Sequence, residues 1–129
     1  GGIICGLKTC DVLVPGDHGS TFGMNPVACA GACVVLDTMD EAFLDSVKAK
    51  SEMIRSELKK MKKVTGLDGL GLMIGIDLDG MTGTEAVSKL MEEGVLAIPA
   101  GKRLRLLPPL TISEDEIKTA LEAIQKVLD

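Results

Sequence analysis

The apolar positions of the chain recur with a helical period in four segments, and the stretches between them have the pattern of strands. The spacing predicts helices at about 26–39, 40–63, 82–93 and 113–128. Residues that favour helix starts support these positions. Asn25 precedes a proline at the first helical position, and Thr82 and Ser113 each stand three residues before a glutamate. The first helix is apolar on almost every side, as in helices that are buried within a larger body or against a partner.

Short apolar runs predict strands at 70–78, 96–99 and 103–107. From residue 66 the expected order is strand, helix, strand, strand and helix. This order is typical of an α+β unit with a short sheet and helices packed on one of its faces. A further apolar strand is expected at the start of the chain, where Gly1 and Gly2 run directly into Ile3 and Ile4.

Composition excludes several classes of function. The 129 residues carry a net charge of −5, and 46% of them are hydrophobic. An acidic chain with two aromatic residues, Phe22 and Phe43, lacks both the positive surface and the stacking platforms of nucleic-acid-binding proteins. No apolar stretch is long enough for a membrane span, and the start does not resemble a signal peptide. A cytoplasmic globular protein without nucleic-acid or membrane partners is expected.

The four cysteines are predicted to be buried thiols. Cys29 and Cys33 stand four residues apart in an alanine- and valine-rich helix, which is the spacing of small residues on one helix face. The chain has one histidine and no CxxC pair, so a metal site is not expected. The glycines of residues 69–75 do not form a dinucleotide-binding motif, because their spacing differs from GxGxxG and they lie within a strand pattern.

The loop at 17–23, with the sequence DHGSTFG, has two interpretations. Ser20 and Thr21 supply hydroxyl groups, and the glycines around them leave backbone N–H groups open to an anion such as phosphate. The same residue types form ordinary turns. His18 has no partner pattern that identifies it as a catalytic base. The loop alone therefore leaves an anion site and a plain turn as alternatives.

Several motifs, in the same order along the chain, resemble class III (ω-) pyridoxal-phosphate-dependent aminotransferases. Residues 17–26 are similar to the HGSTFGGNP segment of that family, and residues 69–75 to its RGxGLMIG strand. Residues 99–101 and 105–110 are similar to its PAG and LRLLPPL motifs. The resemblance covers essentially the whole chain and is greatest to the branch that acts on N-acetylornithine, followed by the branch that acts on ornithine.

This resemblance implies the C-terminal part of a type I aminotransferase fold. Residues 1–39 are then the end of the large cofactor-binding domain, with a phosphate-contact loop at 17–24 and a connecting helix, and residues 40–129 are the small domain. The implied reaction moves the terminal amino group of N-acetylornithine or ornithine to 2-oxoglutarate, in arginine biosynthesis. The cofactor is pyridoxal 5'-phosphate. The family's Schiff-base lysine precedes the glycine segment that Gly1 and Gly2 resemble, so the 129 residues alone are expected to be inactive.

The resemblance also assigns candidate site residues. Thr21, with Ser20 beside it, would contact the phosphate of the cofactor, across to the neighbouring subunit of a homodimer. Arg105 corresponds to the family's arginine that binds either an active-site glutamate or the α-carboxylate of glutamate or 2-oxoglutarate. A planar guanidinium suits this task because it holds a carboxylate in a fixed orientation. Arg103 is the rival candidate, since it lies two residues away on the same face of the expected strand.

Two residues depart from the family pattern. Met24 stands where the family usually has the second glycine of GGNP, which would crowd the loop or alter its backbone. Asp68 stands where the family usually has the arginine of RGxG, which reverses a charge at the start of the strand.

Two other classes of function remain open at this point. One is a non-catalytic interaction module, because the apolar first helix and the opening strand would promote self-association. The other is a small regulatory domain that binds a free amino acid, because the order of elements after residue 66 is compatible with such a domain.

Overall fold

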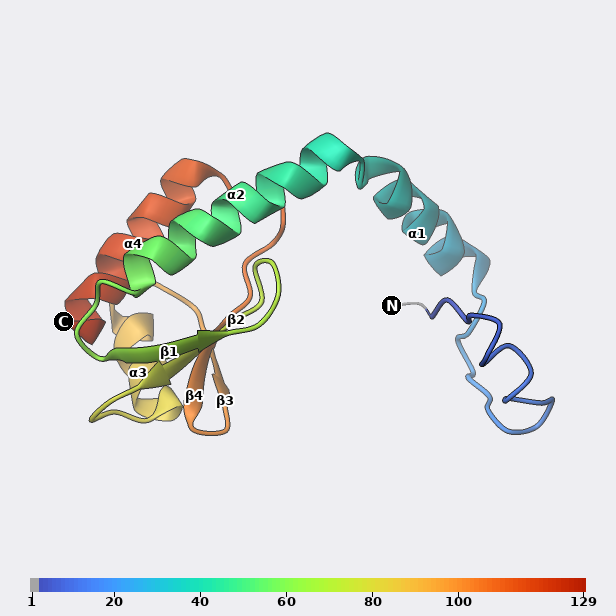
Figure 1. The fold of residues 1–129 in the computed structure, drawn as a ribbon, viewed down its shortest axis with the longest axis horizontal. Coiled ribbons are helices and arrows are strands. Elements are labelled where there is room, and N and C mark those ends of the chain that lie inside the picture. Colours follow the sequence, from blue (N-terminus) through green and yellow to red (C-terminus); the bar gives the residue numbers. More distant parts are fainter. Residues whose placement is uncertain (1–2) are drawn as a thin grey trace. The chain divides into compact units, whose positions relative to one another are not determined.

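A computed structural model describes residues 3–129 (Figure 1). Its contacts divide the chain into two units, Gly1–Met39 and Asp40–Asp129. None of the helices in the described residues has the length and hydropathy that a membrane-spanning helix needs.

Within residues 3–39, the first unit contains one regular element, the helix α1 (Pro26–Thr38). Asn25 caps it, because its side-chain oxygen accepts hydrogen bonds from the backbone N–H groups of Val27 and Ala28 at 3.0 and 3.3 Å. The strand expected at the start is not formed within residues 3–39, where no other segment is extended alongside it to pair with.

The expectation that the cysteines are buried is wrong for this structure. All four thiols are exposed and free. α1 has no buried residue, because residues 3–24 form turns and irregular segments that do not cover it.

Three helices belong to the second unit: α2 (Glu41–Leu58), α3 (Gly83–Glu92) and α4 (Glu114–Leu128). The capping boxes at the starts of α3 and α4 are confirmed. In each, the serine or threonine side chain accepts from the backbone N–H of the glutamate, and the glutamate side chain accepts from the backbone N–H of the cap residue. α2 is shorter than predicted. It ends at Leu58, and the chain turns so that the N–H of Lys63 donates to the carbonyl oxygen of Leu128 at 3.0 Å.

The sheet has four antiparallel strands in the order β1-β2-β4-β3: β1 (Val64–Asp68), β2 (Ile74–Leu78), β3 (Ile98–Ala100) and β4 (Arg103–Leu106). The sequence pattern missed β1 and made β2 four residues too long. Gly69 is the reason, because it has a φ of +100° and turns β1 into β2. A Cβ at Gly69 would lie 2.1 Å from the carbonyl oxygen of Met73, so only glycine fits this turn.

The two faces of the sheet have different environments. Ile74, Ile76 and Leu104 are fully buried against the helices and form the core together with residues from α2, α3 and α4. The opposite face, which we call the open face, carries residues that are half-buried or exposed: Gly66, Asp68, Gly75, Asp77, Arg103 and Arg105. The α+β fold class, with helices on one face of a short sheet, is confirmed (Figure 1).

A close backbone contact fixes α3 against β4. The N–H of Gly83 donates to the carbonyl oxygen of Lys102 at 3.0 Å. A Cβ on Gly83 would lie 2.0 Å from the carbonyl oxygen of Arg103, so any side chain would force the helix away from the strand. The position of β4, and with it of the side chains on the open face, therefore depends on glycine at the start of α3.

Replacing Gly83 with alanine is expected to lower the free energy of unfolding by about 1–3 kcal/mol, the usual range for overpacking. Thr84→Ala, at the next position of the helix, is the matched control because Thr84 is exposed, and it is expected to change stability by less than ~0.5 kcal/mol. Urea unfolding followed by circular dichroism measures both. Equal stability of the two variants would contradict the close contact.

The two capping boxes also make stability depend on pH. Hydrogen bonds from Thr82 and Ser113 hold the pKa of Glu85 and of Glu116 below the ordinary value. A lowered pKa in the folded state adds stability above the ordinary carboxyl range, and this stability is lost as the pH falls below about 4. Urea midpoints measured at pH 7 and pH 3 should therefore differ less in the variant Glu85→Gln/Glu116→Gln, because glutamine caps without titrating. Glu122→Gln is the control and should retain the full pH dependence.

Candidate functional site

The loop of residues 17–24 presents hydrogen-bond donors that have no partners within residues 3–129. The hydroxyl groups of Ser20 and Thr21 make no hydrogen bond there, and neither do the backbone N–H groups from His18 to Phe22. Ser20 and Thr21 are exposed. The carbonyl oxygen of Ser20 accepts from the N–H of Gly23 at 3.3 Å, which closes a tight turn around Thr21. Such a loop can surround an anion with donors without the help of a metal.

Met24 keeps the backbone conformation that a glycine would adopt at this position. Its φ is +59°, and among residues 3–129 it is the non-glycine residue in the left-handed region. This conformation costs roughly 1–2 kcal/mol for a residue with a Cβ. The side chain is 91% exposed, so it does not crowd the loop. The departure from the family pattern therefore strains the backbone and leaves the space around Thr21 open.

The second group of candidate residues lies on the open face of the sheet. The register of the strands places Asp68 opposite Gly75, and Gly75 opposite Arg105. In the neighbouring row, Gly66 is opposite Asp77. Side chains alternate between the two faces of a strand, so burial of Leu104 and Leu106 in the core puts both arginines of β4 on the open face.

Arg103 is held by two carboxylates. Its Nε donates to Oδ1 of Asp77 at 2.6 Å, and its Nη1 donates to Oδ2 of Asp68 at 3.2 Å. Oδ1 of Asp68 accepts from the N–H of Gly69 at 2.7 Å. This backbone hydrogen bond, followed by the interaction with Arg103, holds the pKa of Asp68 below its ordinary value. The reversed charge at position 68 is therefore matched by a cation on β4.

Arg105 differs from Arg103 in having no ion pair within the described residues. Its Nε is buried and has no hydrogen-bond partner there. An unsatisfied buried N–H donor carries a cost of about 1–3 kcal/mol, and an oxygen ligand would remove it. Of the two arginines of β4, the structure leaves Arg105 available to bind a carboxylate.

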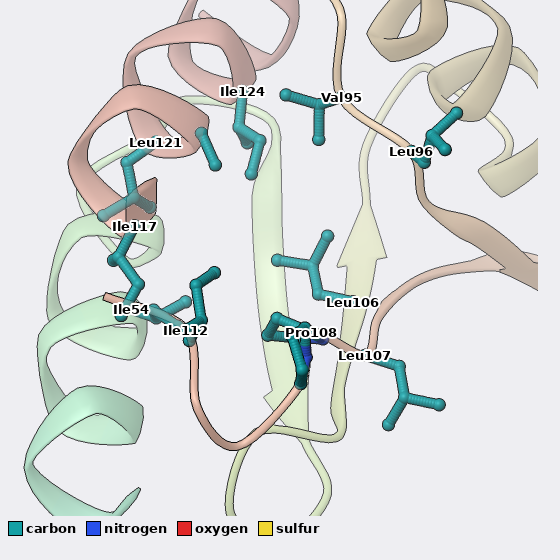
Figure 2. A pocket seen from close by; sticks show the side chains of 12 residues that line it. Ile54, Val95, Leu96, Leu106, Leu107, Pro108, Ile112, Ile117, Leu121 and Ile124 are labelled. Carbon is teal, nitrogen blue, oxygen red and sulfur yellow. The ribbon is translucent and has the colours of Figure 1, made fainter. Parts of the chain in front are cut away.

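A hollow of about 290 Å³ lies on the other side of β4, between α2, α4 and the segment that follows β4 (Figure 2). Its walls are aliphatic side chains and prolines, which include Ile54, Leu106, Pro108 and Ile124. Figure 2 shows Leu106 pointing toward Val95 and Ile124, with Leu107 turned away from them. The hollow offers no titratable or hydrogen-bonding side chain, so it supports β4 and supplies no chemistry of its own.

The predicted site residues thus fall into two groups. Ser20 and Thr21 lie in the first unit and Arg105 in the second. Sequence reasoning missed Asp77 as the carboxylate closest to Arg103. The alternation of β2 carried the signal, since Asp77 stands two residues from Gly75 on the face opposite to Ile76.

Comparison with known proteins identifies the family. The sequence profile of the family Aminotransferase class-III matches residues 2–128. The chain is 37% identical to acetylornithine aminotransferase of Haemophilus ducreyi, over 99% of this chain and 33% of that protein. It is 41% identical to the acetylornithine aminotransferase of Synechocystis sp., over 99% of this chain and 32% of that protein. The chain therefore spans about a third of the length of these curated relatives.

Solved structures agree with the sequence comparison. The ornithine aminotransferase of Toxoplasma gondii superposes with a TM-score of 0.77 at 34% identity, over 94% of this chain and 30% of that one. The acetylornithine aminotransferase of Elizabethkingia anophelis superposes with a TM-score of 0.73 at 36% identity, over 92% of this chain and 33% of that one. The expected resemblance is confirmed, and the chain belongs to the class-III aminotransferase family.

Proposed function

We propose that this chain is the C-terminal third of an aminotransferase that moves the terminal amino group of N-acetylornithine or ornithine to 2-oxoglutarate. The observation that carries the proposal is Arg105, a guanidinium with an unsatisfied buried Nε on the open face of the sheet. The relatives named acetylornithine and ornithine aminotransferase support the choice of substrate class. In this proposal residues 1–39 end the large domain and residues 40–129 form the small domain.

The loop around Thr21 is the proposed contact to the phosphate of pyridoxal phosphate. The donor set fits a dianion, because two hydroxyl groups and several backbone N–H groups lie in one exposed turn without partners in the described residues. No carboxylate of the described chain bonds to Ser20 or Thr21. When bound, the cofactor supplies the electron sink that transfer of an amino group requires.

Arg105 is the proposed carboxylate-binding residue of the reaction. A guanidinium that makes two parallel hydrogen bonds fixes both the position and the rotation of a carboxylate. Arg105 would therefore orient glutamate or 2-oxoglutarate by its α-carboxylate. The core packing of Leu104 and Leu106 on either side holds its backbone in place.

Other parts of the expectation stay predictions. The 129 residues contain no counterpart of the family's cofactor-binding lysine, so we propose that they have no transaminase activity by themselves. The homodimer, the phosphate contact across its interface and the cytoplasmic location also stay predictions.

The phosphate contact is tested in a chimera in which this chain replaces the C-terminal third of the Haemophilus ducreyi enzyme. Thr21→Ala removes a hydroxyl donor to a charged group, which is worth roughly 1.5–3 kcal/mol. The dissociation constant of the cofactor should therefore rise by about one to two powers of ten, measured by cofactor absorbance after dialysis. Thr21→Ser keeps the hydroxyl and is the matched control. Equal retention of cofactor by the alanine and serine variants would reject the contact.

The carboxylate contact is tested by the two half-reactions of the same chimera. Arg105→Lys keeps the charge and loses the planar pair of donors, so the half-reaction with glutamate should slow by roughly tenfold or more while cofactor binding persists. The half-reaction with the amine donor should slow less, because there the arginine is expected to pair with its active-site glutamate and not with the substrate. Single-turnover absorbance changes measure each rate. If Arg103→Lys, and not Arg105→Lys, slowed only the half-reaction with glutamate, the carboxylate-binding role would belong to Arg103 and the assignment to Arg105 would be wrong.

A further inference from the structure

The register of the sheet puts two aspartates on the open face near Arg105, with Asp68 in the same row and Asp77 in the neighbouring row. Asp68 shares a row of the sheet with Arg105, and only Gly75 stands between them. Strands are about 5 Å apart, so the Cα atoms of Asp68 and Arg105 are roughly 10 Å apart across β2, and a fully extended arginine spans much of that distance. Gly75 has no side chain to separate the two groups. Asp68 nevertheless pairs with Arg103 and not with Arg105.

The path of Arg103 over the sheet explains this pairing. Its side chain extends from β4 across β2, meets Asp77 at 2.6 Å and reaches Asp68 on β1 at 3.2 Å. A Cβ at Gly75 would already lie 3.8 Å from Cδ of Arg103, so a larger side chain there would obstruct the crossing. A Cβ at Gly66 would lie 2.8 Å from Oδ2 of Asp77, so glycine makes room for that carboxylate. The two aspartates therefore bind the side chain of Arg103 along the open face, and the two glycines leave the space that it and Asp77 occupy.

We propose that Arg103 is a positioning residue that occupies Asp68 and Asp77 and so leaves the guanidinium of Arg105 available for a substrate carboxylate. The proposal rests on the carboxylate-binding role proposed for Arg105. An aspartate is ionised at neutral pH even at its ordinary pKa, so without Arg103 the carboxylate of Asp68 becomes an internal competitor for Arg105. Arg103 acts through these aspartates and does not itself touch the substrate.

The test uses the 129-residue chain and the NMR signals of the arginine Nε–H groups. In Arg103→Leu, the freed carboxylates should pair with Arg105, and its Nε–H signal should move downfield. The triple variant Arg103→Leu/Asp68→Asn/Asp77→Asn should return that signal to its original position, because both competitors are removed. The matched control Arg103→Leu/Asp45→Asn/Asp115→Asn has the same net charge. It should keep the shifted signal, since Asp45 and Asp115 lie on the helices and pair with lysines.

Titration with glutarate, a dicarboxylate probe, adds a readout of binding. The concentration for half-saturation of the Arg105 shift should rise roughly two- to fivefold in Arg103→Leu, which is the range expected for displacing one exposed ion pair. The triple variant with both aspartates replaced should recover, and Arg103→Lys, which can still pair with Asp77, should recover in part. If Arg103 only stabilised the fold, replacing Asp68 and Asp77 as well would not restore glutarate binding.

Two single variants keep the test decisive if Arg103→Leu unfolds. In Asp68→Asn and in Asp77→Asn, the signal of Arg103 should move while that of Arg105 stays in place. An Arg105 signal that moves in either variant would show that Arg105 is already paired, and would overturn the proposal. So would an unchanged Arg105 signal in folded Arg103→Leu. If glutarate does not shift the Nε–H signal of Arg105 in the unmodified chain, the proposed carboxylate-binding role of Arg105 is wrong. The Nε–H signals of the variants still show separately whether Arg103 keeps the two aspartates from pairing with Arg105.

Discussion

The alternation of side chains along β4 is the constraint on which the rest of the second unit depends. Leu104 and Leu106 enter the core, and this alone turns Arg103 and Arg105 to the open face. A shift of the strand by one residue would bury two guanidinium groups and expose two leucines, so the core strongly specifies the register. The Gly83 contact fixes the same strand from the side of α3. The placement of the candidate carboxylate-binding residue is thus a consequence of packing on the opposite face.

Much of this architecture could be predicted from the sequence. The capping boxes at Thr82 and Ser113 mark α3 and α4 because their hydrogen bonds are local and involve residues three positions apart. β1 could not be found in this way. It is short, has a glycine at its centre and depends on pairing with β2, which is a non-local interaction. The end of α2 was missed for the same reason, since the N–H of Lys63 bonds to the far end of the chain.

The candidate site was predictable only as far as motifs reach. The sequence indicated Arg105 and its rival Arg103 together, and it contained nothing that ranked them without the family resemblance. The ranking requires the register across three strands, which brings Asp68 and Asp77 to Arg103. The strain at Met24 was foreseeable in kind, because a glycine in a family motif often marks a left-handed backbone. The exposure of α1 could not be predicted, because an apolar helix indicates that something covers it and does not say whether the cover lies in the same chain.

The two units therefore differ in what supports their candidate residues. Arg105 stands on a strand whose core side is fully packed, so its backbone is fixed by burial within residues 40–129. Thr21 stands in a loop whose nearest regular element, α1, buries nothing. A helix of thirteen residues without tertiary contacts is marginal in water, even with a good cap. The loop at 17–24 thus has no packed layer beside it within the described residues, whereas Arg105 and the ion pairs of Arg103 are supported by the core of the second unit.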